Sequence, residues 1–285
     1  MSAEAGTATV GERRSVNRAL GVLAWAVGLV MFFPVFWMVL NSFKSEQDAN
    51  TSPKLFFHPT LDRYRDVTKS ASGLLSFGEA FTNSAIVVIV STLIVLALAI
   101  PAAYALAIVP VRKWRDALFF FISTKFLPVV AAILPIWILA RNFELLNTQL
   151  VLIILYTAIN LPLAVWMLHS FFKEIPRELI ESAEIDGASL KGQLTSIILP
   201  MASPGIAATA LLCLIFAWNE FFYAVQLNPV DGSTMPIWVT TNVSTRGDFL
   251  AKLSAASVLA CIPVVIAGWL AQKRMIRGLA MGAIK

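Results

Sequence analysis

Long apolar runs separated by short polar stretches dominate this chain. Six runs approach the roughly 20 residues that a helix needs to cross a bilayer, and they carry almost no charge. None shows the strict alternation of apolar and polar residues that is typical of a membrane barrel strand. The pattern therefore predicts six membrane-spanning helices, at Ala19–Leu40, Ala85–Val109, Ala117–Ala140, Leu150–His169, Gly205–Leu227 and Leu253–Ala271.

The composition supports this class of protein. Hydrophobic residues make up 58% of the 285 residues and charged residues 14%, against about 45–50% and about 25% in an average soluble domain. A soluble protein of this length would lack the polar side chains to cover its surface. We therefore expect an all-α integral membrane protein with one transmembrane domain over residues 1–285. It comprises an N-terminal extension (1–18), a six-helix membrane domain (19–271) and a tail (272–285).

The distribution of Lys and Arg predicts the orientation of these spans. With a cytoplasmic N-terminus and six crossings, 13 of the 22 basic residues lie on the cytoplasmic side and eight outside, with Lys125 inside a span. Cytoplasmic loops of membrane proteins carry such an excess. We expect both termini in the cytoplasm. The net charge of +5 then needs no nucleic-acid partner.

The segment 171–200, between the fourth and fifth spans, is polar enough to lie on the inner membrane face. Pro176 suits the first turn of a helix, and acidic residues follow it up to Asp186. Gly187 permits a backbone conformation that other residues resist. A second helix can run from Ala188 to Ile198 before Pro200. The pattern predicts a helix-turn-helix.

This segment resembles the EAA loop of permease subunits in binding-protein-dependent ABC importers. The family pattern is Glu-Ala-Ala, three residues, Gly, nine residues, Ile, one residue and Leu-Pro. Ser182 replaces the first alanine, and Leu194 stands where the sugar branch often has phenylalanine. The residues that carry the match are Glu181-Ser182-Ala183, Asp186-Gly187-Ala188, Ile197 and Leu199-Pro200, with Trp218-Asn-Glu-Phe221 and the end Gly278–Lys285 extending it over the chain.

The resemblance implies partners and a set of coupling residues. In this family the loop is the coupling helix, which sits in a cleft of the ATPase subunit. The implied partners are a second permease subunit in a heterodimer, two ATPase subunits, an extracytoplasmic solute-binding protein and membrane lipid, in a bacterial or archaeal cytoplasmic membrane. The implied coupling residues are Glu181, Ser182, Ala183, Asp186, Gly187, Ala188, Leu199 and Pro200.

Catalysis by this chain is not expected. No Walker A pattern occurs, so ATP and Mg²⁺ would be bound by the partner ATPase, and the chain itself needs no cofactor. The two histidines, His58 and His169, are isolated and form no metal-binding or catalytic motif. The sequence predicts a non-catalytic translocation subunit without a metal site.

Polar residues inside the spans are candidates for the translocation path, because an intramembrane charge costs about 2.5–3.5 kcal/mol on insertion scales. Lys125 could pair with Glu220, line a water-filled path or extend towards the inner face. The aromatic residues near Glu220 could equally belong to an interfacial belt. Pro101, Pro128, Pro135 and Pro162 could mark kinks. The path candidates are Lys125, Asn160, Trp218, Asn219, Glu220 and Tyr223.

Two further contacts are implied by the family alone. The outer segment Asn228–Lys252 would touch the solute-binding protein, through Asp231, Gly232, Ser233 and Thr234. The C-terminal tail would enter the interface of the ATPase subunits. A basic tail on the lipid surface is the alternative for the tail.

The solute class follows from the branch of the family. The chain resembles most the second permease of maltose-type systems, and Ser123–Pro128 resembles sugar-alcohol permeases. The alternatives are an importer of a non-carbohydrate solute, a secondary transporter, which typically has more spans and its own coupling-ion site, and an intramembrane enzyme, which needs clustered catalytic groups.

Overall fold

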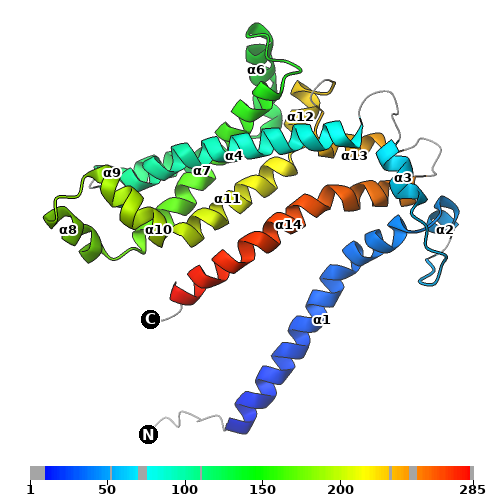
Figure 1. Cartoon of the computed structure of the whole chain (residues 1–285), viewed down its shortest axis with the longest axis horizontal. Coiled ribbons are helices and arrows are strands. Elements are labelled where there is room, and N and C mark those ends of the chain that lie inside the picture. The colour runs from blue at the N-terminus through cyan, green and yellow to red at the C-terminus, as the bar shows by residue number, and fades with distance from the viewer. Residues whose placement is uncertain are drawn as a thin grey trace, which may run out of the picture. The chain divides into compact units, whose positions relative to one another are not determined.

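The computed structural model describes residues 10–51, 53–69, 76–109, 111–230, 233–243 and 249–282, and their side chains except those of 10–19 and 273–282. Within these ranges every regular element is helical (Figure 1). The elements are α1 (Val10–Ser42), α2 (Glu46–Thr51), α3 (Asp62–Lys69), α4 (Phe77–Ala107), α5 (Trp114–Ser123), η1 (Thr124–Phe126), α6 (Val129–Asn142), α7 (Gln149–Lys173), α8 (Arg177–Ile185), α9 (Leu190–Gln193), η2 (Leu194–Ile198), α10 (Leu199–Met201), α11 (Ser203–Trp218), α12 (Phe222–Leu227), α13 (Met235–Thr241) and α14 (Leu250–Gly282).

Four of the described helices are long and apolar enough to cross a membrane: Leu20–Ser42, Phe77–Ala107, Gln149–Lys173 and Leu250–Gln272. Two pairs of helices reach this length only together, because each pair is bent. Trp114–Phe126 meets Val129–Asn142 at 92°, and Leu190–Met201 meets Ser203–Trp218 at 78°. Four to six spans confirm the predicted all-helical membrane protein.

The third predicted span, Ala117–Ala140, is wrong as a single helix. Leu127 has an extended backbone, with φ −64° and ψ 125°, and α6 begins only after Pro128. Proline lacks an N–H group and disfavours a helical conformation at the residue before it. Pro128 thus separates two helices, whereas Pro101, Pro135 and Pro162 lie inside continuous ones.

The fifth predicted span, Gly205–Leu227, is also interrupted. Helix α11 ends at Trp218, and α12 starts at Phe222. Helix α4 begins at Phe77, before the predicted Ala85. Its N-terminus is extended because Ser76 and Glu79 form a reciprocal capping box.

The chain forms two compact units, residues 1–66 with 244–258 and residues 67–243 with 259–285. In the first unit the Ser42 and Tyr64 hydroxyls lie 2.7 Å apart. The Glu46 carboxylate accepts hydrogen bonds from the backbone N–H groups of Ala251 at 3.0 Å and Lys252 at 2.8 Å, which caps the start of α14. The assignment of residues 1–285 to one domain stays a prediction.

The first unit also buries a charged side chain. Lys44 is 1% exposed, and its Nζ lies 4.5 Å from the ring centroid of Trp37 and 5.3 Å from that of Phe57. Aromatic faces attract cations. Burial nevertheless lowers the pKa of Lys44 from its ordinary value, and the charge of Asp48 opposes part of this shift.

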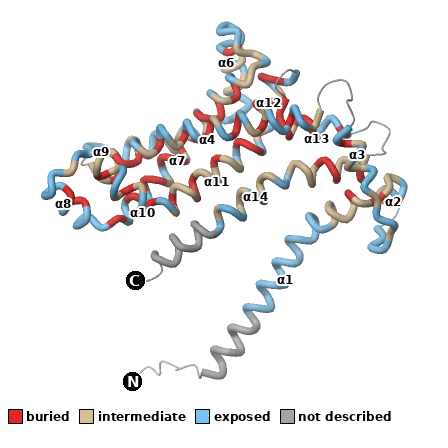
Figure 2. Tube along the Cα trace, in the orientation of Figure 1, coloured by how far each residue is buried: buried red, intermediate tan, exposed pale blue. Residues whose placement is uncertain are grey.

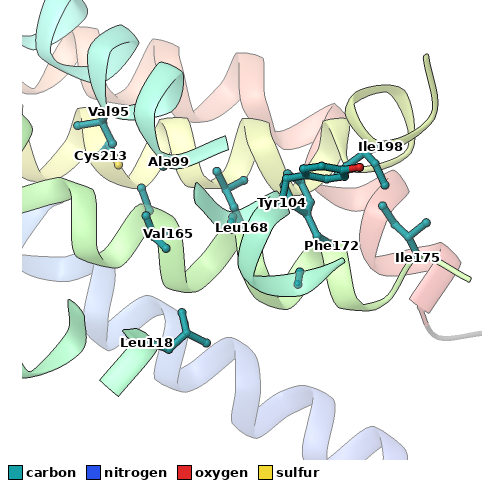
Figure 3. Packing of buried hydrophobic residues seen from close by; sticks show 14 of the residues in the cluster. Val95, Ala99, Tyr104, Leu118, Val165, Leu168, Phe172, Ile175, Ile198 and Cys213 are labelled. Carbon is teal, nitrogen blue, oxygen red and sulfur yellow. The ribbon is translucent and has the colours of Figure 1, made fainter. Parts of the chain in front are cut away.

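The second unit is built on α4, α7 and α11, which pack side by side (Figures 1 and 2). Their apolar core is shown in Figure 3, where Val95, Ala99, Val165 and Cys213 come from three helices. Helices α8, α9 and α10 gather at one end of this bundle and α12 and α13 at the other (Figure 1). The bundle therefore separates two groups of short helices.

Candidate functional site

The predicted helix-turn-helix is present at one end of the second unit. Helix α8 ends at Ile185, and Gly187 then adopts a left-handed conformation with φ +78°. The Ser189 hydroxyl accepts a hydrogen bond from the backbone N–H of Gly192 at 3.2 Å and so caps α9. The turn lies where the position of Gly187 predicts it.

The second helix of this segment departs from the predicted α-helix Ala188–Ile198. After α9 the chain forms a π-helical turn, η2, in which the N–H of Leu199 bonds to the carbonyl of Leu194. Helix α10 follows with Pro200 inside it. The predicted helix is therefore a succession of α, π and α turns.

The tip of the helix-turn-helix is exposed. Ile185 is 87% exposed and Leu190 60%, on either side of the turn. Of the eight residues implied by the resemblance, Ala183 is buried, Ala188 and Leu199 are half-buried, and the exposed members are Glu181, Ser182, Asp186, Gly187 and Pro200. Exposed apolar side chains beside two acids form a surface suited to a protein partner.

Two buried polar residues attach this segment to α4. The Tyr104 hydroxyl donates to Gln193 Oε1 at 2.9 Å, and Gln193 Nε2 donates to the carbonyl of Ala188 at 3.3 Å. Tyr104 is 6% exposed and Gln193 3%. The sequence analysis missed both residues, because a pair separated by 89 positions has no local spacing that would reveal it.

Glu220 lies in the break between α11 and α12. Its carboxylate accepts hydrogen bonds from the backbone N–H groups of Tyr223 at 3.0 Å and Ala224 at 3.2 Å, and from the Tyr156 hydroxyl at 3.0 Å. A half-buried carboxylate needs such donors. Glu220 therefore starts α12 and joins it to α7, and Tyr156 is a further residue that the sequence analysis missed.

Two other path candidates are buried inside the bundle. Trp218 donates from Nε1 to the carbonyl of Ala260 at 3.0 Å, and its ring meets Phe81 edge to face. Asn160 is 2% exposed and donates from Nδ2 to the carbonyl of Tyr156 at 3.0 Å. Trp218 therefore joins α11 to α14, whereas Asn160 bonds within its own helix, α7.

The remaining path candidates differ in their surroundings. Asn219 is exposed and bonds to the carbonyl of Ile215, whereas Tyr223 is buried. Lys125 lies on η1, beside the break at Pro128, and is exposed on this chain. Within the described ranges it forms no ion pair with Glu220. The alternatives of a water-filled path and an extended side chain stay open for Lys125.

The proposed contact segment for the binding protein is only partly described. Asp231 and Gly232 lie outside the described residues. Ser233 is 4% exposed and Thr234 3%. A partner could reach this part of the segment through the neighbouring Pro229 and Val230, which are exposed.

Comparison with known protein families assigns the chain to one of them. Residues 98–277 match the family model of the binding-protein-dependent transport system inner membrane component, and the chain belongs to this family. It is a multi-pass inner membrane protein and the permease subunit of a binding-protein-dependent ABC importer. Permeases of this family are non-catalytic.

Individual relatives cover nearly the whole chain. A probable ABC transporter permease, y4oR of Sinorhizobium fredii, is 33% identical over 95% of this chain and 97% of its own. The trehalose/maltose permease MalG of Thermococcus litoralis is 31% identical over 91% and 93%. A chain in the crystal structure of a bacterial ABC transporter involved in the import of the acidic polysaccharide alginate has a TM-score of 0.72 at 22% identity, covering 94% of this chain and 99% of that one.

Proposed function

We propose that this chain is the second permease subunit of an importer for a carbohydrate, either a sugar or a sugar alcohol. Relatives across most of its length are named as permeases for trehalose and maltose, sulfoquinovosyl glycerol and diacetylchitobiose. The break beside Lys125 contains the Ser123–Pro128 stretch that resembles sugar-alcohol permeases.

The helix-turn-helix segment is the proposed contact with the ATPase. The observation that carries this proposal is the exposed turn at Gly187, with φ +78° and two exposed apolar residues beside it. Two ATPase subunits would bind ATP and Mg²⁺ and move this tip. A second permease subunit would complete the translocation path.

The proposed topology places both termini and the helix-turn-helix in the cytoplasm. The opposite end of the bundle, with α12 and α13, then faces the solute-binding protein. A bacterial alginate transporter of similar fold forms a complex with a periplasmic protein bound to an alginate pentasaccharide, which supports a binding protein as a partner.

The solute class can be tested through the cognate solute-binding protein. Calorimetric binding to a panel of disaccharides, monosaccharides and sugar alcohols is followed by uptake of the tightest ligand in cells with and without this chain. We expect one carbohydrate to bind and its uptake to need the chain. Binding only of an amino acid, peptide or ion would favour a non-carbohydrate importer.

The ATPase contact can be tested by crosslinking. An Ile185→Cys variant, with Cys213 and Cys261 replaced by Ala, should crosslink to the ATPase subunit. A Val230→Cys variant on the same background is the matched control and should not. Equal yields from both positions would reject the contact.

A further inference from the structure

Helix α4 has a polar contact at each end. Near its C-terminus, Tyr104 bonds to Gln193. Gln193 also bonds to the carbonyl of Ala188, the residue after Gly187. Figure 3 shows Tyr104 between Phe172 and Ile198, in the apolar core. Because both polar side chains are buried, loss of the Tyr104 hydroxyl leaves Gln193 Oε1 without a donor, and loss of Gln193 leaves the Tyr104 hydroxyl without an acceptor. Water therefore cannot replace this hydrogen bond when it breaks.

The second contact lies near the N-terminus of α4. The Ser84 hydroxyl accepts a hydrogen bond from the backbone N–H of Met235 at 2.7 Å, and both residues are fully buried. The adjacent Asn83 donates to the carbonyl of Ser233 at 3.4 Å and accepts from Gln149 Nε2 at 2.6 Å. These bonds fasten the segment 233–235 to α4.

The helix between these contacts is a continuous, well-packed rod. Tyr104 follows Ser84 by 20 positions, which corresponds to about 30 Å along an α-helix. Pro101 does not interrupt it. Val87, Val95 and Ala99 are fully buried along its length, and close-packed interiors transmit displacement.

We propose that α4 transmits movement between the Gly187 turn and the segment 233–235, with Tyr104 and Ser84 as positioning residues at its ends. This inference rests on the proposed function, in which the turn contacts the ATPase and the opposite end faces the solute-binding protein. A displacement of the turn pulls on Gln193 and Tyr104, shifts α4, and moves Met235 through Ser84. Docking of the binding protein would act on the ATPase by the reverse route.

The test uses the complete importer in nanodiscs with its solute-loaded binding protein. The readout is the ratio of ATPase activity with and without the loaded binding protein. Tyr104→Phe and Ser84→Ala should each lower this ratio at least threefold, with ATPase activity in the absence of binding protein unchanged. Because the two contacts act in series, the variant with both Tyr104→Phe and Ser84→Ala should have a ratio no lower than that of the more strongly affected single variant. Tyr64→Phe, which removes a hydroxyl hydrogen-bonded to Ser42, is the matched control and should keep the wild-type ratio.

A second pair of variants separates transmission from stability. Tyr104→Phe alone leaves Gln193 Oε1 without its donor, whereas Tyr104→Phe with Gln193→Met removes both partners. The double variant should recover the melting temperature of the complex and keep the low ratio. Recovery of the ratio together with the melting temperature would show that Tyr104 is only structural and would overturn the proposal.

A Gly187→Leu variant measured in parallel distinguishes this inference from the proposed function. If Gly187→Leu lowers the ratio but Tyr104→Phe and Ser84→Ala do not, transmission through α4 is rejected and the ATPase contact stands. If Gly187→Leu keeps the wild-type ratio, the ATPase contact is rejected, and the inference that rests on it falls as well.

Discussion

Gly187 holds the turn of the helix-turn-helix at φ +78°, a conformation that costs a residue with a Cβ atom about 1–2 kcal/mol. A Cβ built at this position meets no atom of the chain within 4 Å. Within this subunit the glycine is therefore needed for its backbone conformation and not for space.

In the assembled importer, substitutions of Gly187 should show whether the turn needs the left-handed backbone conformation or the space left by a missing side chain. We expect Gly187→Leu to insert normally but to lose most solute-stimulated ATPase activity and uptake. Gly187→Asn should keep much of both, because asparagine adopts the left-handed region more readily. Normal coupling in Gly187→Leu, at normal assembly, would contradict this role for the turn.

Removal of the Glu220 carboxylate should destabilise the junction of α7, α11 and α12. Glu220→Leu leaves two backbone N–H groups without an acceptor. It leaves the Tyr156 hydroxyl only the backbone carbonyl of residue 220, at 3.3 Å. Each buried unsatisfied group costs about 1–3 kcal/mol. Glu220→Gln keeps one acceptor oxygen and should lose less. The melting temperature of the purified complex measures the difference. An unchanged melting temperature with a raised KM for uptake would instead assign Glu220 to the solute.

The buried Lys44 should make the stability of the first unit depend on pH. Its pKa in the folded protein is lowered from 10.5, so the folded state releases this proton at a lower pH than the unfolded state. Stability therefore rises as the pH increases from the lowered pKa towards 10.5. Relative to Lys44→Met, which carries no charge, the wild-type melting temperature should increase between pH 7 and pH 10. A constant difference would contradict the burial of a charged lysine.

At the scale of elements, the contact of α7 with α11 depends on one small residue. The ring of Phe171 lies so close to Gly205 that a Cβ there would overlap it. We expect Gly205→Ala to cost about 1–3 kcal/mol through overpacking, measured as a lower melting temperature. Phe171→Ala in the same chain should relieve the overlap. Gly78→Ala, where a Cβ meets nothing within 4 Å, is the control, and an equal loss there would refute the explanation.

The elements that the sequence predicts correctly carry a strong local signal. The turn at Gly187 follows from a glycine between two helical patterns, and the apolar runs of α4 and α7 are long enough to identify alone. The break at Pro128 could not be distinguished from a kink, because Pro101, Pro135 and Pro162 lie inside continuous helices. The break at Glu220 depends on a carboxylate that accepts the freed N–H groups of α12. The pairing of Tyr104 with Gln193 depends on how α4 and α9 pack together. The periodicity of apolar residues along each helix does not show this packing.

At the scale of the molecule, the orientation in the membrane is open to a direct measurement. With Cys213 and Cys261 replaced by Ala, a membrane-impermeant maleimide should label Lys54→Cys in intact cells. It should label Lys191→Cys only after lysis. Both native lysines are exposed in the structure. The reverse pattern would invert the predicted topology and move the helix-turn-helix outside the cell.

The π-helical turn Leu194–Ile198 has a consequence for the length of the polypeptide. A π turn holds one residue more than an α turn, so the nine residues between Gly187 and Ile197 include one that an ordinary helix would not need. Deleting Thr195 could close this turn into an α turn and keep the direction of the chain on either side of it. A deletion in an ordinary α turn would instead rotate the chain beyond it by about 100°. The apolar tip would then point in a different direction around the axis of the segment. The spacing of the motif is in this sense an angular setting. The π turn takes up one residue, and a deletion elsewhere in the segment would turn the exposed apolar tip away from the proposed ATPase contact while leaving every motif residue present.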